Sequence, residues 1–243
     1  MSRSDVFTPP GQRGRIGVIQ PSPGLMLEAE WARAMPDGVA FPVTRLVLRG
    51  GARSDYAAMA ERAPEAAATL ANAGVGVIGY ACGIGSLAEG PAAERALMDR
   101  LTSAAGGIRV IGMAEAAVGV MRAQGARRVT LLTPYAGPIN QLVCTYLTGS
   151  DLQVAALASL PTASPVTAVT LRAEQIIAAA QAAARLAPTD LLWIPCGNVR
   201  VIDLNAELQA ATGLPCVSSN QALLDTALAH LGMIRTLSYS PER

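Results

Sequence analysis

The chain has 243 residues, of which 51% are hydrophobic and 15% charged, and its 19 basic and 18 acidic residues give a net charge of +1. This composition supports a sizeable core, and the balanced charge argues against a nucleic-acid partner. No apolar run reaches the roughly 18 residues that indicate a membrane span, and the polar start lacks the apolar segment of a signal peptide. We therefore expect a cytoplasmic protein with no membrane partner.

Short apolar runs alternate with Ala-rich stretches along the whole chain. After an expected flexible tail at 1–14, eight runs predict strands at 15–20, 43–48, 75–81, 108–112, 128–133, 152–157, 190–195 and 214–218. Helical stretches between or after them include 54–74, 114–125, 139–149, 172–187 and 220–232. Continuous apolar strands that alternate with helices predict a mostly parallel α/β sheet.

The second half of the chain repeats the pattern of the first. Pro21 follows the first predicted strand and Pro134 follows the fifth, 113 positions later. Cys82 ends the third strand and Cys196 ends the seventh, 114 positions later. We therefore predict an α/β fold of two pseudo-symmetric four-stranded lobes, an N-terminal lobe of residues 15–115 plus 220–243 and a C-terminal lobe of residues 116–219.

Cys82 and Cys196 are the candidate catalytic residues. Ligands of open α/β sheets bind beyond the carboxyl ends of the strands, so the two thiols would face each other across one cleft. Gly83 and Gly197 follow them and allow close approach of the backbone. Residues 86–89 (SLAE) have capping-box spacing, which predicts a helix start near the first thiol. Two facing thiols can move a proton across a substrate, or one can attack while the other acts as acid or base.

The other cysteines and the single histidine limit the kinds of metal or catalytic site that the chain can form. No cysteine pair has CxxC spacing, and only His230 could complete a His-dependent site, so we expect no metal and no Ser–His or Cys–His pair. His230 ends an apparent helix, where a cation complements the helix dipole. Cys144 and Cys216 lie within apolar segments and are expected in the core. Any single cysteine can be a core residue, but the equivalent positions of Cys82 and Cys196 favour a function.

Polar residues follow other strands on the same edge. Tyr135 follows the fifth strand, Ser218 and Ser219 follow the last, and Ser22 and Gly24 follow the first. Each could contact a ligand. The alternatives are a tyrosine at a lobe boundary, helix capping by the serines, and a plain turn after the first strand.

Several of these segments resemble the aspartate/glutamate racemase superfamily. The segments are GYAC (79–82), GARRVTLLTPY (125–135), PINQLV (138–143), PCG (195–197) and TGLPCVSSNQALLDTAL (212–228). They are most similar to the branch that holds maleate cis-trans isomerases and arylmalonate decarboxylases, and the resemblance runs from about Arg15 to Gly232. It implies two lobes with the active site between them, a small carboxylate substrate, a homo-oligomer, and no metal or organic cofactor.

The resemblance also implies residue roles. In a maleate-isomerase-like reaction, Cys82 as a thiolate would add to one alkene carbon, and the resulting single bond could rotate. Cys196 would supply and then remove a proton before elimination. The residues implied in substrate binding are Tyr135, the backbone near Gly83, Ile84, Gly197 and Asn198, and the closing turn at Ser218 and Ser219.

Two departures from the family pattern concern carboxylate binding. Gly24 stands where maleate isomerases carry an asparagine, and the segment 159–170 lacks a second family asparagine. Each lost donor would cost about 1–3 kcal/mol if a carboxylate oxygen stayed unpaired. The neighbouring Pro23, Leu25 and Met26 are apolar, which suits a less polar substrate or another α-substituted acid.

These observations leave three hypotheses. The first is an isomerase or racemase of a small carboxylic acid that uses both cysteines. The second is a decarboxylase of the arylmalonate type, in which Cys196 alone protonates an enediolate, although the presence of Cys82 argues for chemistry on two faces. The third is a non-catalytic protein that binds small acids. A turn like SSNQ also occurs in ectoine-utilisation proteins of the superfamily, so that role stays open.

Overall fold

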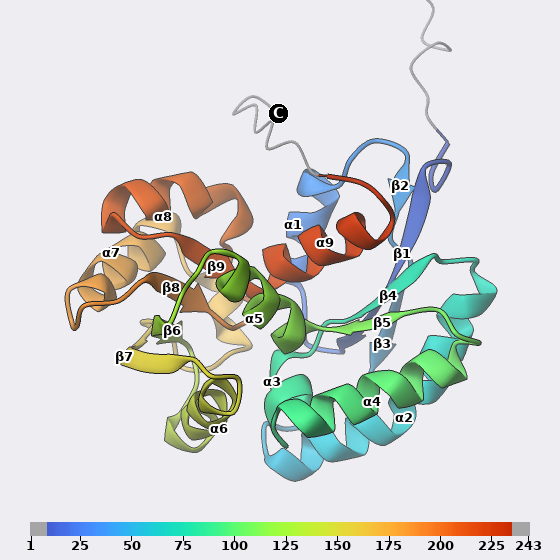
Figure 1. Ribbon diagram of the computed structural model, residues 1–243, viewed down its shortest axis with the longest axis horizontal. Helices are drawn as coiled ribbons and strands as arrows, with labels where there is room; N and C mark the ends of the chain where they lie inside the picture. The colour runs from blue at the N-terminus through green and yellow to red at the C-terminus, as the bar shows by residue number, and fades with distance from the viewer. Residues whose placement is uncertain (1–8, 235–243) are drawn as a thin grey trace, which may run out of the picture.

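The computed structural model describes residues 9–234 and contains two parallel sheets side by side (Figure 1). The first sheet holds β1 (Gly14–Pro21), β2 (Val39–Ala40), β3 (Val43–Leu46), β4 (Val77–Tyr80) and β5 (Val110–Gly112). The second sheet holds β6 (Arg128–Thr133), β7 (Gln153–Ser159), β8 (Leu191–Ile194) and β9 (Cys216–Ser218). All eight predicted strands are therefore present.

The first sheet has five strands instead of the predicted four. Both β2 and β3 pair with β1, through Gly14 and Val39 for β2 and through Val18 and Val43 for β3. Pro42 lies between the two short strands and has no N–H to give to a ladder, although its carbonyl accepts from Val18 N at 2.9 Å. The predicted second strand at 43–48 is thus β3, and the short β2 before Pro42 was not predicted.

Nine α-helices and two short 3₁₀ segments connect the strands in the described part of the chain. The five helices predicted from the sequence are present as α2, α5, α6, α7 and α9. Of the others, α4 begins with Pro91, which is a typical first helical residue. The bounds are α1 Met26–Ala34, α2 Arg53–Asn72, α3 Gly83–Leu87, α4 Pro91–Ala104, α5 Met113–Ala123, α6 Gly137–Thr148, η2 Thr167–Thr170, α7 Ala173–Ala184, η3 Ile202–Leu204, α8 Asn205–Thr212 and α9 Ser219–His230.

The two sheets have the same internal order, which confirms the predicted pseudo-symmetry. Across the first sheet the order is β3–β1–β4–β5, and across the second it is β7–β6–β8–β9. Helices α5 and α9 follow the last strand of each sheet and pack against each other near the middle of the molecule (Figure 1). Leu223 of α9 also packs on Gly79 of β4. The division of the chain into lobes at 115/116 and 219/220 stays a prediction.

One continuous apolar core joins the two sheets, and it includes Ile16 of β1 and Leu131 of β6. Strand β1 already begins at Gly14, within the predicted tail, whereas residues 1–8 of that tail and residues 235–243 lie outside the described part. Between residues 9 and 234 no helix combines the length and apolar character needed to cross a membrane.

Candidate active site

Two equivalent turns carry the predicted cysteines. Strand β4 ends at Tyr80 and β8 ends at Ile194, and a cysteine follows two residues beyond each strand. Cys82 is 3% exposed and Cys196 is 5% exposed. The shared sheet order therefore puts a buried thiol at the carboxyl end of the same strand in each half, as the repeat predicted.

The two turns touch each other. A Cβ atom on Gly83 would lie 3.1 Å from Pro195 O, so the first turn runs directly against the second. Met113 at the start of α5 lies beside both turns, with its Sδ 3.8 Å from that position and its Cε 4.0 Å from the equivalent point on Gly197. The negative charge of a Cys196 thiolate would raise the pKa of Cys82. The fold thus brings the two thiols into one site.

Cys82 has one hydrogen-bond donor in the first turn. It is the N-cap residue of α3, and Gly85 N donates to its Sγ at 3.3 Å. Burial raises the pKa of the thiol to about 12, and this N–H opposes the shift. The predicted helix start near the first thiol is present, but Cys82 takes the capping position instead of Ser86, which lies inside α3. Ile84 is buried in the same short helix.

Three groups near Cys196 act against the effect of burial on its thiol. Burial raises the pKa of its thiol, and hydrogen bonds from Asn198 N–H, the Tyr135 hydroxyl and Val199 N–H oppose that shift. In the folded protein the single proton of the Tyr135 hydroxyl is donated to Pro195 O at 2.9 Å, next to Cys196. The sequence predicted that this hydroxyl could reach the cleft, and its contact with a ligand stays a prediction.

Tyr56 near the start of α2 is a site residue that the sequence reasoning missed. Burial raises the pKa of its half-buried hydroxyl, and the charges of Cys82 and Cys196 raise it further, so Tyr56 lies near both thiols. Tyr56 also lines a cavity of about 330 Å³ with Gly85 and Ser86. The one signal in the sequence was that Tyr56 lies near the start of the helix that follows the second predicted strand. The helical pattern itself does not distinguish Tyr56 from the other residues of that helix.

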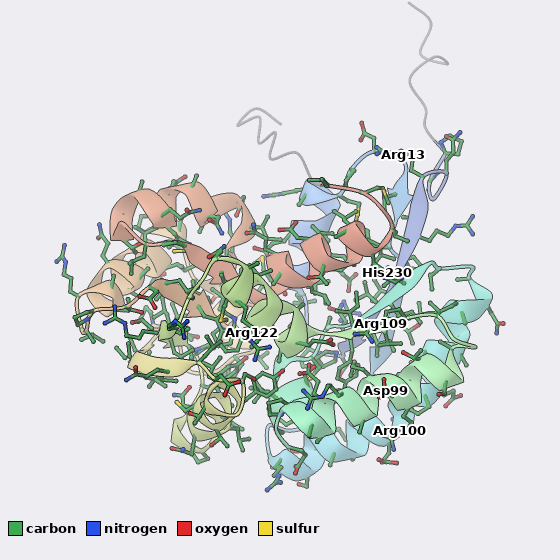
Figure 2. The ribbon with its side chains drawn as sticks, viewed as in Figure 1. Arg13, Asp99, Arg100, Arg109, Arg122 and His230 are labelled. Atoms are coloured by element: carbon green, nitrogen blue, oxygen red, sulfur yellow. The ribbon has the colours of Figure 1, made fainter. Side chains whose placement is uncertain are left out.

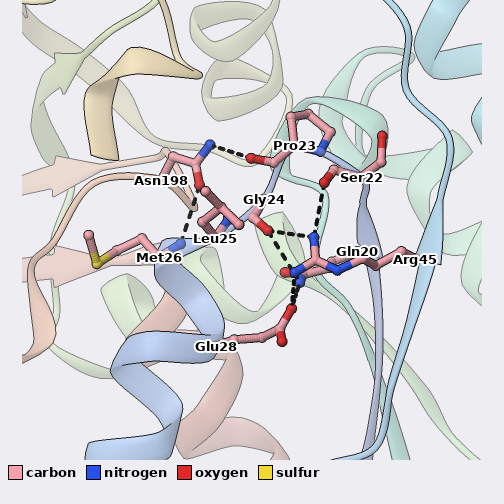
Figure 3. A network of polar contacts seen from close by, with 9 residues as sticks. All are labelled: Gln20, Ser22, Pro23, Gly24, Leu25, Met26, Glu28, Arg45 and Asn198. Atoms are coloured by element: carbon pink, nitrogen blue, oxygen red, sulfur yellow. Dashed lines mark hydrogen bonds and ion pairs between the residues drawn. The ribbon is translucent and has the colours of Figure 1, made fainter. Parts of the chain in front are cut away.

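Polar contacts hold the loop after β1 in place (Figure 3). Arg45 of β3 donates to Ser22 O at 3.0 Å and to Gly24 O at 2.7 Å, and it forms an ion pair with Glu28 of α1. Ser22 is exposed, and its Oγ accepts from Leu48 N at 3.2 Å. These contacts fix the backbone of the loop, as the plain-turn alternative expected, and contact of Ser22 with a ligand stays a prediction.

The side chain of Asn198, from the other half of the molecule, forms hydrogen bonds to the same loop (Figure 3). Its Oδ1 accepts from Leu25 N at 2.9 Å, and its Nδ2 donates to Pro23 O at 3.1 Å. The amide is therefore occupied by the loop, and only the backbone N–H of Asn198 is directed to Cys196. A Cβ on Gly24 would lie 3.2 Å from Pro21 O, so this position has little room for the family asparagine.

The serines after β9 have protein partners. Ser218 is the N-cap of α9 and accepts from Gln221 N at 3.3 Å, which is the capping alternative. Ser219 Oγ accepts from the indole N–H of Trp193 at 3.2 Å. Both serines are almost fully buried. Their contact with a substrate stays a prediction.

Glu30 of α1 supports the second turn from behind, and no local pattern in the sequence indicated it. Its carboxylate accepts from Val201 N at 2.5 Å, from Ile202 N at 2.7 Å and from Asn220 Nδ2 at 2.7 Å. Asn220 donates in turn to Gly197 O at 3.0 Å. Burial raises the pKa of Glu30 to about 6, although the three donors oppose the shift. A buried, hydrogen-bonded carboxylate thus fixes the backbone beside Cys196.

The remaining candidate residues lie elsewhere. Cys216 is buried in β9, where burial raises its pKa to about 11, and Cys144 is half-buried on α6. His230 lies in the last turn of α9 and lines a separate cavity of about 360 Å³ with Arg109 (Figure 2). Within residues 9–234, no group of three or more His, Cys, Asp or Glu side chains is placed to hold a metal ion.

Comparison with known proteins shows that this chain is similar to maleate isomerases and arylmalonate decarboxylases. The family described as arylmalonate decarboxylase matches residues 16–238. Maleate isomerase from Nocardia farcinica is 29% identical over 217 residues, which cover 86% of each chain, and arylmalonate decarboxylase from Bordetella bronchiseptica is 27% identical over 85% of this chain and 86% of its own. A cysteine-to-serine mutant of the N. farcinica maleate cis-trans isomerase, solved with a covalently bound succinylcysteine intermediate, superposes with a TM-score of 0.82 at 26% identity over 90% of this chain and 93% of that chain.

Proposed function

The chain belongs to the arylmalonate decarboxylase family, and from that premise we propose that it is a cofactor-independent isomerase of a small carboxylic acid, acting on maleate or a close analogue by cis-trans isomerisation. The observation that carries the proposal is the pair of buried thiols in two touching turns. A decarboxylase needs one proton donor, whereas isomerisation through an adduct needs a nucleophile and an acid. The covalent succinylcysteine in the N. farcinica enzyme supports the adduct chemistry.

The charge coupling between the thiols suits a division of roles. Because a thiolate at one cysteine raises the pKa of the other, a state with one thiolate and one thiol is favoured over a state with two thiolates. In the reactive state, Cys82 is the thiolate and Cys196 keeps its proton. Burial makes the Cys82 thiolate a poorly solvated and therefore strong nucleophile once it forms.

The reaction follows from these two groups. The Cys82 sulfur forms a bond to one alkene carbon, and the electron pair of the double bond moves toward the neighbouring carbon and its carboxylate. The Cys196 thiol gives its proton to that carbon, which leaves a single bond that can rotate. Cys196 then takes a proton back, the double bond reforms, and the bond to the Cys82 sulfur breaks. The three groups near Cys196 that act against the effect of burial stabilise the thiolate that exists while the adduct is present.

Substrate carboxylates would bind to donors around the two turns. We assign this role to the Tyr135 hydroxyl and to backbone N–H groups near Gly83, Ile84, Gly197 and Asn198. Ser218 and Ser219 would close the site, and the loop at Ser22 and Gly24 would cover it. Tyr56 adds a hydroxyl near both thiols.

A second candidate is decarboxylation or racemisation of an α-substituted acid, with Cys196 as the proton donor. It is favoured by the loop after β1, where Leu25 and Met26 are apolar and the amide of Asn198 is occupied by the backbone. Such a loop offers contact to an apolar substituent better than it offers donors to a second carboxylate.

The test is proton NMR of the purified protein with maleate in D₂O. Appearance of the fumarate singlet, with partial loss of its proton signal to deuterium delivered by Cys196, is the expected result. The Cys144→Ser variant should give the same spectrum and serves as the control. If maleate is unchanged, and an aryl-substituted malonate instead loses CO₂, the isomerase proposal is wrong and the second candidate replaces it.

Two further expectations from the sequence accompany this proposal. We propose a homo-oligomer, because its relatives by resemblance are oligomeric, and a cytoplasmic location. Size-exclusion chromatography with light scattering tests the first, and fractionation of the source cells tests the second.

A further inference from the structure

We propose that the Tyr80 hydroxyl is the second hydrogen-bond donor to the Cys82 thiolate and therefore positions and activates the nucleophile. The inference rests on the proposed function, because it assumes that Cys82 reacts as a thiolate. It gives Tyr80 a role through Cys82 and not through contact with the substrate.

The two side chains lie on the same side of one chain segment and meet at Gly85. Tyr80 is the last residue of β4, and Cys82 is two residues further on, so both side chains point the same way. A Cβ atom on Gly85 would lie 2.9 Å from Tyr80 Oη and 2.9 Å from Cys82 Sγ. Both atoms therefore border the same small space, which only a glycine leaves open.

The Tyr80 hydroxyl has no hydrogen-bond partner among the described residues, although the residue is completely buried. A buried hydroxyl without a partner costs free energy, and few native structures retain one without a reason. Cys82 Sγ borders the same space at Gly85, and a thiolate there is a much stronger acceptor than the thiol, so a small shift of either side chain would pair it with this hydroxyl. The unpaired hydroxyl is then a donor held in place for the charged form of the nucleophile.

The inference also accounts for a difference between the two thiols. Asn198 N–H, the Tyr135 hydroxyl and Val199 N–H lower the pKa of Cys196, whereas among the described residues Gly85 N alone lowers that of Cys82. A second donor at Cys82 would reduce this difference, because it would stabilise the Cys82 thiolate more than Gly85 N does alone. After addition to the substrate the sulfur is an uncharged thioether, so the same donor also favours the return of the thiolate.

Other charged and titratable groups around these two residues are few. The charge of Glu94 raises the pKa of Tyr80, and that of Arg100 lowers it. A charge on Cys196 raises the pKa of Cys82, and the charge of Cys82 raises the pKa of Tyr56. None of them changes in a Tyr80→Phe variant, which removes one oxygen that has no partner. This variant should therefore fold normally.

The experiment measures the rate of Cys82 alkylation by iodoacetamide between pH 6 and 10, with the modified cysteine identified by peptide mass mapping. Loss of a hydrogen bond to a charged group should shift the rate profile of Tyr80→Phe to higher pH and slow the reaction about tenfold at each pH below the thiol pKa. The kcat/KM for isomerisation should fall by a similar factor. The matched control is Tyr146→Phe, since Tyr146 is a buried tyrosine whose hydroxyl donates to Glu94 and not to Cys82.

The outcomes separate this inference from the proposed function. A Tyr80→Phe profile that matches the wild type overturns the role of Tyr80 and leaves the proposed function standing. An equal slowing in Tyr146→Phe also overturns it, because the effect would then come from the packing of buried tyrosines. If wild-type Cys82 reacts no faster than Cys144 or Cys216, the nucleophile itself is wrong, and the inference falls with the proposed function.

Discussion

The turn at Cys82 and the turn at Cys196 occupy equivalent places in the two sheets but have different surroundings. The second turn is fixed by Glu30, Asn220 and the side chain of Asn198, which reach it from both halves of the molecule. The first turn is a short helix start in which Gly85 N donates to the thiol at 3.3 Å. The pseudo-symmetry of the fold therefore decides where the thiols lie, and the local donors decide what each thiol can do.

This difference indicates that the surroundings of Cys196 are fixed, whereas those of Cys82 are more adaptable. A thiol that gives and takes back a proton benefits from a rigid set of donors, because its charge changes during the reaction. The nucleophile loses its charge when its sulfur bonds to carbon, so a smaller number of donors around it favours the addition step. The four predictions that follow test this asymmetry, from the largest expected effect to the smallest.

Replacement of either cysteine by serine should have the largest effect. We expect Cys82→Ser and Cys196→Ser each to reduce isomerisation by about a thousandfold or more, because neither serine hydroxyl ionises readily in a buried turn. Steady-state kinetics with maleate would measure the loss, with Cys144→Ser as the control. Full activity in Cys82→Ser would contradict a role for both cysteines, since only the second turn would then be catalytic.

Loss of the Glu30 carboxylate should have the next largest effect. Glu30→Ala leaves two backbone N–H groups and the amide of Asn220 without their acceptor, so we expect the free energy of unfolding to fall by about 3 kcal/mol. Chemical denaturation would measure this change. Glu174→Ala, at an exposed position of α7, should change stability by less than about 0.5 kcal/mol. Equal effects in the two variants would show that Glu30 does not support the second turn.

The raised pKa of Glu30 also predicts a dependence of stability on pH. Because the folded-state pKa of about 6 lies above the ordinary value of 4.5, the folded protein holds this proton more tightly than the unfolded chain does. The stabilisation of the folded state that comes from this tighter proton binding is complete below pH 4.5. It is lost as the pH rises through 6, and the free energy of unfolding then falls by about 2 kcal/mol in total. Denaturation curves between pH 4 and 7 should show this decline, and it should be absent in Glu30→Gln. A decline that persists in Glu30→Gln would assign it to another group.

Removal of the Asn198 amide should have the smallest effect of the four. Asn198→Ala frees the loop at 22–26 from the second turn but keeps the backbone N–H that points to Cys196, so we expect about a tenfold loss in kcat/KM. Asn198→Asp should lose less, because its carboxylate can still accept from Leu25 N. If Asn198→Ala is as active as the wild type, the contact between loop and turn has no role in the reaction.

Much of the fold could be predicted from the sequence. The eight apolar runs and the spacing of Pro21 with Pro134 and of Cys82 with Cys196 gave the strands, their parallel pairing and the two-sheet arrangement. These features depend on residues that are close in the chain or on a repeat, and both leave a pattern that can be recognised. The short β2 before Pro42 and the capping position of Cys82 were missed, because the first is a detail at one edge of the sheet and the second gives a cysteine the place of the usual serine.

The candidate site could be predicted in part. The rule that ligands bind at the carboxyl ends of parallel strands selected Cys82, Cys196 and Tyr135, which the structure brings together. The same rule could not tell that the side chain of Asn198 contacts the loop after β1 or that Ser219 accepts from Trp193. These partners lie 173 and 26 residues apart in the chain.

The sequence by itself determined the two thiols at the ends of equivalent strands, since strand periodicity and the repeat are local properties of the chain. Only the tertiary structure decided which groups surround each thiol. Tyr56 of α2 lies near both cysteines, and Glu30 reaches the second turn across 171 residues of sequence. The physical reason is that burial and hydrogen bonding set a pKa, and both depend on atoms that become neighbours only when the two halves pack together.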